Sequence, residues 1–120
     1  MKKIVRLHYE KELSLYKQNY DFKSFEQCWE HLERAHILGQ FSWKDHFFVH
    51  IKMFTLAVRS RNVGEIIGQI PRLILAIPGS LLGKAPKGNI GSSKVGIFQP
   101  MSIPEDLKQI IEFDENRKGP

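Results

Sequence analysis

The sequence predicts an all-α protein: a small helical bundle with a tetratricopeptide-like helical hairpin and a long wrapping loop. Apolar residues recur at spacings of three and four over most of residues 3–77, and residues typical of helix ends separate these stretches. With 120 residues, of which 42% are hydrophobic, the chain suits one domain. We expect residues 1–120 to form a single helical domain. Histidine-bearing helices would occupy residues 3–62, and a kinked helix, a Gly/Pro-rich loop and a short helix residues 63–113.

The first helix is expected over residues 3–20, because its apolar side chains form one stripe. These side chains are Val5, Tyr9, Leu13, Tyr16 and Tyr20. The second helix should begin at Ser24, which forms a capping-box pattern with Gln27, and should end at Gly39. Together the two helices resemble one tetratricopeptide unit. Such a unit cannot bury its own apolar face, so further helices must cover it.

The third helix should begin after Ser42, with Asp45 favourably placed in its first turn. Its apolar stripe is expected to comprise Phe47, Ile51, Phe54 and Val58. A fourth helix is expected over residues 65–77, where Pro71 should kink or divide it because proline lacks a backbone N–H.

Residues 78–100 are rich in Gly, Pro and Ser, which predicts an extended loop wrapping over the helices. Ser102 and Glu105 form another capping-box pattern, which predicts a last helix ending near residue 113.

Composition narrows the possible functions. Cys28 is the only cysteine, so the chain can form neither an internal disulfide nor a Cys-rich zinc site, as suits a reducing compartment such as the cytoplasm. The net charge is +5, but the basic residues are scattered, which disfavours specific nucleic-acid binding. Polar residues and prolines interrupt the apolar run Ile66–Leu82, so we expect no transmembrane segment. Peripheral membrane association through this run stays open.

Several motifs resemble a bacterial domain-of-unknown-function family, number thirty-seven-oh-three. They are HLERAHILGQ, then W-x-x-H-x-x-x-H, GQIPRLILAIPGSLLGKAPKGNIG and PMSIPEDL. The resemblance implies a short bacterial protein without an assigned activity, with genes for heavy-metal or cation efflux nearby in some members. It also implies that the family's histidines are His36, His46 and His50, with Glu33 beside them. This chain reads GNIGSS where the family would have GNTGG.

The same residues converge on geometric grounds. His46 and His50 are four apart on one predicted helix, Met53 continues their face, and Glu33 and His36 are three apart near the end of the preceding helix. Folding this hairpin about its turn brings His36 level with His46 and Glu33 level with His50. Three imidazoles and a carboxylate could bind a transition metal such as zinc, copper or nickel, and the Met53 sulfur would favour copper(I).

Other readings stay open. His36 could simply bond a neighbouring polar group in the core, and His46 could be an exposed residue. The domain could be a protein-interaction module without a metal. The segment Gly83–Ser93 offers backbone donors and lysines to an anion, although it lacks the order of a P-loop. With a metal bound, the protein would be a binding protein and not an enzyme, unless a coordination position were open to water.

Overall fold

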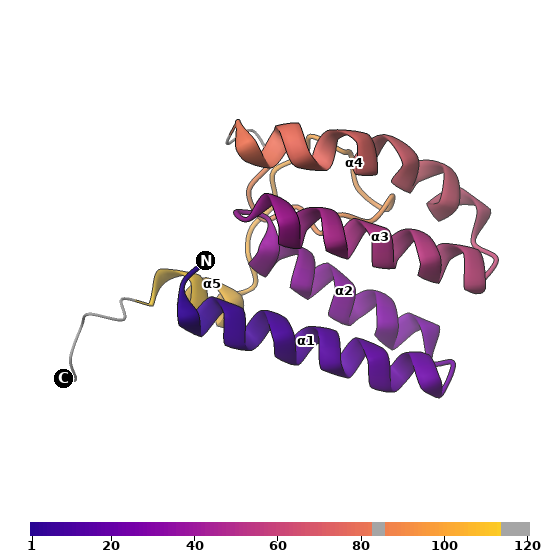
Figure 1. Cartoon of the computed structure of the whole chain (residues 1–120), viewed down its shortest axis with the longest axis horizontal. Helices are drawn as coiled ribbons and strands as arrows, with labels where there is room; N and C mark the ends of the chain where they lie inside the picture. Colours follow the sequence, from indigo (N-terminus) through magenta and orange to yellow (C-terminus); the bar gives the residue numbers. More distant parts are fainter. Residues whose placement is uncertain (83–85, 114–120) are drawn as a thin grey trace.

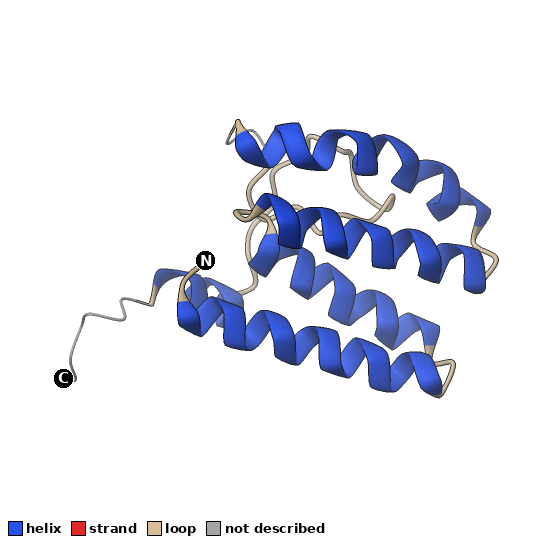
Figure 2. Cartoon of the chain, in the orientation of Figure 1, coloured by secondary structure: helices blue, strands red, loops and turns tan. Residues whose placement is uncertain are grey.

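The computed structural model describes residues 1–82 and 86–113, and the fold over these residues is all-α, as predicted (Figures 1 and 2). The described part of the chain contains no strand. Its helices are α1 (Lys3–Asp21), α2 (Phe25–Gly39), α3 (Trp43–Arg59), α4 (Val63–Leu81) and α5 (Glu105–Glu112). The last helix is shorter than expected, because Pro104 and not Ser102 occupies its N-cap position.

The first four helices lie side by side in chain order, each running opposite to its neighbour (Figure 1). Helix α1 packs on α2, α2 on α3 and α3 on α4, while α5 packs across α1 and α2. The segment after α4 returns over the bundle and hydrogen-bonds to both α2 and α4, from Ser92 to Glu33 and from Gln69 to Gly91. It is therefore the predicted wrapping loop, and it joins two helices that are not neighbours in the bundle.

The core is formed mainly by the facing sides of α1, α2 and α3. Its fully buried apolar side chains include Tyr9, Leu32, Leu38, Val49 and Leu56. The apolar stripe predicted for the third helix is wrong, since Ile51 and Val58 are exposed. The buried face of α3 instead comprises His46, Val49, His50, Met53, Leu56 and Ala57. Two histidines therefore share the buried face of α3 with apolar side chains, and this face is rotated from the predicted stripe.

Helix α4 continues through Pro71 and Pro78, so the predicted end at residue 77 is wrong and Pro71 does not divide the helix. Both prolines are exposed, as is Ile67, whose carbonyl loses its helical partner at Pro71. Water can solvate a carbonyl on this face, which lowers the cost of a proline within the helix.

The helix starts also differ from the predicted capping patterns. Neither Ser24 nor Ser42 makes a side-chain cap hydrogen bond. The first turn of α3 is held from outside, because the Arg6 guanidinium of α1 donates to both oxygens of Asp45 at 2.7 and 2.8 Å. Two parallel bonds of this kind set both the distance and the orientation of α1 relative to α3.

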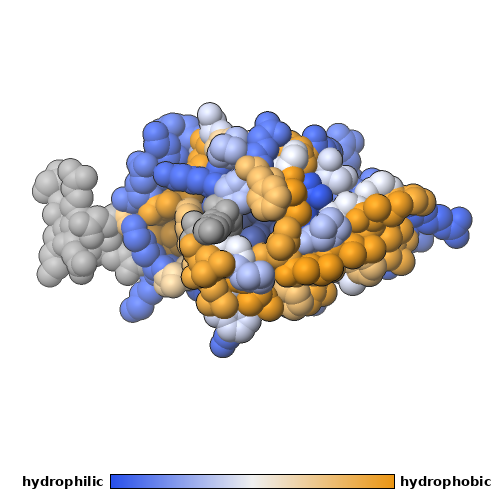
Figure 3. Space-filling model, turned by 90° about the horizontal axis from the view of Figure 1, so that it is seen from above, coloured by the Kyte–Doolittle hydropathy of each residue, from blue (hydrophilic) through white to orange (hydrophobic). Residues whose placement is uncertain are grey.

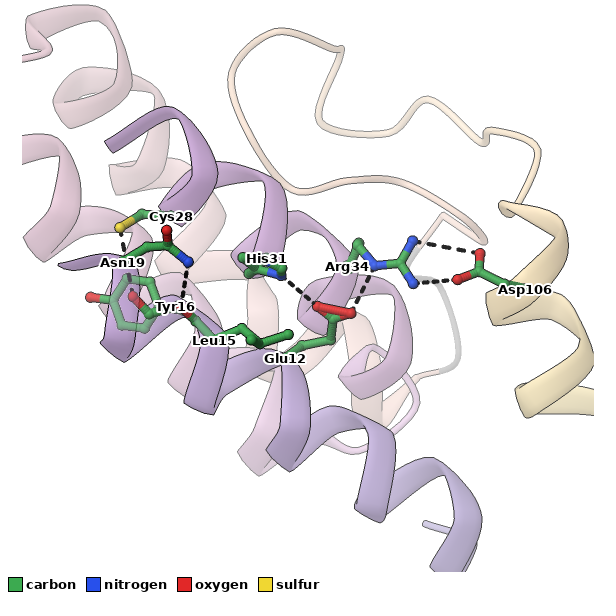
Figure 4. A network of polar contacts seen from close by, with 8 residues as sticks. All are labelled: Glu12, Leu15, Tyr16, Asn19, Cys28, His31, Arg34 and Asp106. Atoms are coloured by element: carbon green, nitrogen blue, oxygen red, sulfur yellow. Dashed lines mark hydrogen bonds and ion pairs between the residues drawn. The ribbon is translucent and has the colours of Figure 1, made fainter. Parts of the chain in front are cut away.

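A second polar network joins α1, α2 and α5 (Figure 4). Glu12 is buried, and its two carboxylate oxygens contact His31 Nδ1 and Arg34 Nε, each at 2.8 Å. Arg34 also binds Asp106 at the start of α5. His31 is thus paired within this network and lies outside the predicted histidine cluster.

One face of α4 is apolar yet exposed, and it forms a hydrophobic band when the molecule is seen from above (Figure 3). The exposed side chains of this face are Val63, Ile67, Ile70, Ile74 and Leu81. None of the helices in the described ranges has the length and apolar character needed to cross a membrane.

Candidate metal centre

Three histidines meet in the interior, between the end of α2 and the beginning of α3. His36 lies in the last turn of α2, and His46 and His50 lie one turn apart on α3. The Nε2 atom of His36 is 3.0 Å from that of His46 and 3.0 Å from that of His50, and the latter two are 3.2 Å apart. The three residues are only 3–6% exposed. The structure therefore brings three imidazoles of the predicted cluster together, and His46 is not the exposed residue of the alternative reading.

The other nitrogen of His36 has an acceptor. Its Nδ1 lies 2.7 Å from the backbone oxygen of Asn89, in the wrapping loop. Since a carbonyl oxygen can only accept, Nδ1 carries the proton and Nε2 of His36 presents a lone pair.

The ring of His50 is oriented in the same way, by the side-chain amide of Gln69. Its Nδ1 lies 2.8 Å from Oε1 of Gln69 on α4. The Nε2 group of Gln69 donates to Glu65 Oε2 at 3.1 Å and to the backbone oxygen of Gly91 at 3.0 Å. These two acceptors leave Oε1 to accept from His50, so the Nε2 atom of His50 is also bare. The resulting chain of carboxylate, amide and imidazole is a typical outer shell of a metal-binding histidine.

The three imidazoles are neutral at neutral pH, because burial and their mutual proximity disfavour protonation. Burial, followed by the nearby His50 and His46, lowers the pKa of His36 well below its ordinary value. Burial lowers the pKa of His46 to about 4, and burial together with His46 lowers that of His50 to about 3. A bond to the backbone of Ala76 acts in the opposite direction on His46. Neutral imidazoles whose bare nitrogens face one another are arranged as ligands of a cation.

The spacing of the nitrogens suits a first-row transition metal. In a tetrahedral site with Zn–N bonds of about 2.0–2.1 Å, the ligand nitrogens lie about 3.3–3.4 Å apart. The Nε2 atoms here, at 3.0–3.2 Å, are slightly closer and would need only a small outward rotation of the rings. One coordination position would remain for a further ligand.

The other two predicted ligands have different surroundings. Among the described residues, the group whose ligand atoms lie within 4.8 Å of one another comprises the three histidines and does not include Glu33. Oε2 of Glu33 accepts from the Ser92 hydroxyl at 2.6 Å, and burial raises the pKa of its carboxyl group. Met53 is fully buried in the apolar core. Their ligation stays a prediction.

A cavity of about 210 Å³ opens beside the imidazoles. Its lining includes all three histidines and side chains from α4 and the wrapping loop, among them Arg72, Leu75, Leu82, Ile97 and Phe98. Arg72 and Gln69 were not predicted as site residues. They interrupt the apolar run Ile66–Leu82, and polar residues within such a run were the feature that could have indicated a site.

Over its described residues, the protein is thus an all-helical protein with a buried cluster of three histidines. A family model described as "Protein of unknown function (DUF3703)" matches residues 3–111, so the chain belongs to that family, and the resemblance predicted from its motifs is confirmed. No curated protein matches the chain. No solved structure matches it either.

The first prediction concerns Gly91, whose φ of +86° favours glycine. A Cβ added there would lie 2.5 Å from Cδ2 of His36. We expect Gly91→Ala to lower the free energy of unfolding by roughly 2–3 kcal/mol, from backbone strain and the clash together. Chemical denaturation followed by circular dichroism measures this. Gly64→Ala, where the added Cβ meets only an ordinary contact at 3.7 Å, is the matched control. Equal stability of the two variants would contradict the packing of Gly91 on His36.

The second prediction concerns the metal-free protein. Because the folded pKa values of His46 and His50 lie below the unfolded value of about 6.5, the unfolded state binds more protons below that pH. Stability is therefore complete above pH 6.5 and falls as the pH decreases toward about 4 and 3. Between pH 6 and 5 each of the two groups should remove about 1 kcal/mol.

This dependence is measured by urea denaturation in the presence of a chelator. His50→Gln should make it shallower by one group, because it removes one imidazole whose pKa is lowered in the folded state. An unchanged slope in His50→Gln would contradict the burial of a neutral His50.

Proposed function

We propose that the protein binds one transition-metal ion through Nε2 of His36, His46 and His50, as a metal-binding protein of cellular metal homeostasis. The observation that carries this proposal is the convergence of three buried Nε2 atoms, of which at least two are bare because Nδ1 is engaged elsewhere. At most one N–H, on Nε2 of His46, can face these two lone pairs and would have to be shared between them, whereas one metal ion can bind both.

The donor set favours zinc, copper or nickel over calcium or magnesium, which prefer oxygen ligands. Three imidazoles are sufficient for copper(I), while zinc would need a fourth ligand. Glu33 is a candidate for that ligand if its carboxylate exchanges Ser92 for the metal. We propose binding and not catalysis as the primary role, with the cytoplasm as the location.

The third prediction is that protein prepared without a histidine tag contains one equivalent of metal, detected by elemental analysis. The double variant His46→Ala, His50→Ala should lose it, because a single imidazole binds such ions weakly. His8→Ala, His31→Ala removes the same number of imidazoles outside the cluster and should retain full stoichiometry. Absence of zinc, copper and nickel from the purified protein, together with failure to take them up in dialysis, would overturn the proposal.

The exposed apolar face of α4 favours a second candidate, association with an anionic membrane surface. The exposed Arg59 and Arg61 lie at the turn that precedes this helix, and the chain has a net charge of +5. An amphipathic helix with an apolar face and basic neighbours is typical of proteins that lie in the headgroup region of a bilayer.

The fourth prediction follows from this face. The protein should co-sediment with vesicles containing phosphatidylserine, less so at high salt, and only weakly with phosphatidylcholine alone. Ile67→Glu with Ile74→Glu should reduce binding about tenfold or more, because both side chains would enter the lipid. Glu26→Gln with Glu30→Gln, exposed on α2, serves as the control. Equal sedimentation with both kinds of vesicle would contradict the electrostatic part, and unchanged binding of the Ile variant would contradict the role of α4.

A further inference from the structure

A cationic side chain borders the cavity beside the trihistidine cluster, in addition to the imidazoles. Arg72 is 8% exposed and borders the cavity. Its Nη1 donates to the backbone oxygen of Gly68 and its Nη2 to that of Val95, both at 2.7 Å. Its Nε atom is buried and has no hydrogen-bond partner. A buried guanidinium bonded only to neutral carbonyls retains its full charge in a poorly solvated place, which is costly unless an anion accompanies it.

Glu65 is the carboxylate whose charge acts on Arg72, but it is already hydrogen-bonded to other donors. Glu65 accepts from Gln69 Nε2, from the backbone N–H of Ser93 and from the Ser93 hydroxyl. No ion pair of Arg72 is found among the described residues. With a divalent ion on three neutral imidazoles, and with Glu33 left on Ser92, the cavity would carry two positive centres, while its described lining includes no carboxylate.

The remaining walls are apolar. Leu75, Ala76, Leu82, Ile97 and Phe98 line the cavity, and Leu82 and Phe98 are 68% and 70% exposed, which places them toward its opening. A volume of about 210 Å³ is far more than a single metal-bound water requires. The cavity therefore combines two cationic centres with a hydrophobic wall, as expected for an anion that carries a small apolar group.

We propose that this cavity binds a small organic carboxylate, whose carboxylate reaches the open position of the metal and the Arg72 guanidinium while its apolar group packs on Leu75, Leu82 and Phe98. This inference rests on the proposed metal site. The carboxylate fits both centres, since it can coordinate a metal through one oxygen and accept a charge-assisted hydrogen bond through the other.

Cobalt(II) is a suitable probe, because its visible absorption reports both its uptake and a change of coordination. The cobalt-loaded full-length protein is titrated with benzoate, with benzamide as a neutral isostere and with nitrate and bicarbonate as inorganic anions. We expect a saturable spectral change with benzoate, none with benzamide, and at least tenfold weaker binding of the inorganic anions.

Two variants test the cationic and the apolar part of the cavity one at a time. Arg72→Met should weaken benzoate about tenfold or more while cobalt stoichiometry stays at one, because it removes a charge-assisted hydrogen bond. Phe98→Ala, at a largely exposed position, should weaken benzoate but leave the binding of acetate unchanged. Should Arg72→Met fail to fold, the comparison of benzoate with benzamide on the unaltered protein still tests the charge requirement.

The outcomes distinguish the two proposals. Cobalt uptake without a response to benzoate, or an equal response to benzamide, would overturn the carboxylate site and leave the metal site standing. Inorganic anions that bind as tightly as benzoate would overturn the organic ligand in favour of an inorganic one. Failure of the protein to take up cobalt, zinc or copper would overturn the metal site itself, and this inference with it.

Discussion

The arrangement of this protein depends on the orientation of three buried imidazole rings. Each ring has two nitrogens, and Nε2 can face the other rings only if Nδ1 finds an acceptor elsewhere. For His36 that acceptor is the backbone of Asn89, and for His50 it is Gln69. The cluster on α2 and α3 therefore also holds the wrapping loop and α4 in position. Loss of either acceptor would leave a buried donor unpaired, so the site and the packing of its surroundings are one structural unit.

Much of the fold could be predicted because helices are local. The approximate limits of the first three helices follow from apolar spacing and from residues typical of helix ends such as Gly39, whereas the buried face of the third does not. A periodicity argument counts histidine as polar and so assigned Ile51 to the core. Neutral imidazoles with their Nδ1 groups bonded can be buried at little cost, and α3 turns His46 and His50 inward instead. The length of α4 was missed for a related reason, since the effect of Pro71 depends on whether its face is solvated.

The site was predictable to the extent that a tight hairpin determines it. Residues equidistant from a turn must come level, and this brings His36 to His46. His50 joins them because it lies one helical turn from His46, whereas Glu33, which was predicted to pair with His50, is not in the group. The acceptors that orient the rings lie far away in the sequence, with Asn89 53 residues beyond His36. No local pattern connects a loop carbonyl with a particular histidine. The same limit applies to Glu33, whose bond to Ser92 depends on how the loop returns over α2.

Helix α4 buries polar side chains and exposes apolar ones, which is the opposite of the usual arrangement in a globular protein. Its buried face contains Glu65, Gln69 and Arg72 at spacings of four and three, while Ile67, Ile70 and Ile74 are exposed. Burying charged groups such as Glu65 and Arg72 is costly even when they are hydrogen-bonded, and well-packed apolar residues in their place would often give equal or greater stability. Stability alone therefore does not account for this face. Two residues of this face orient the histidine cluster, since Gln69 is bonded to His50 and Glu65 is bonded to Gln69. The third, Arg72, adds a positive charge to the cavity that the imidazoles border, and a charge placed there serves a ligand better than it serves the fold.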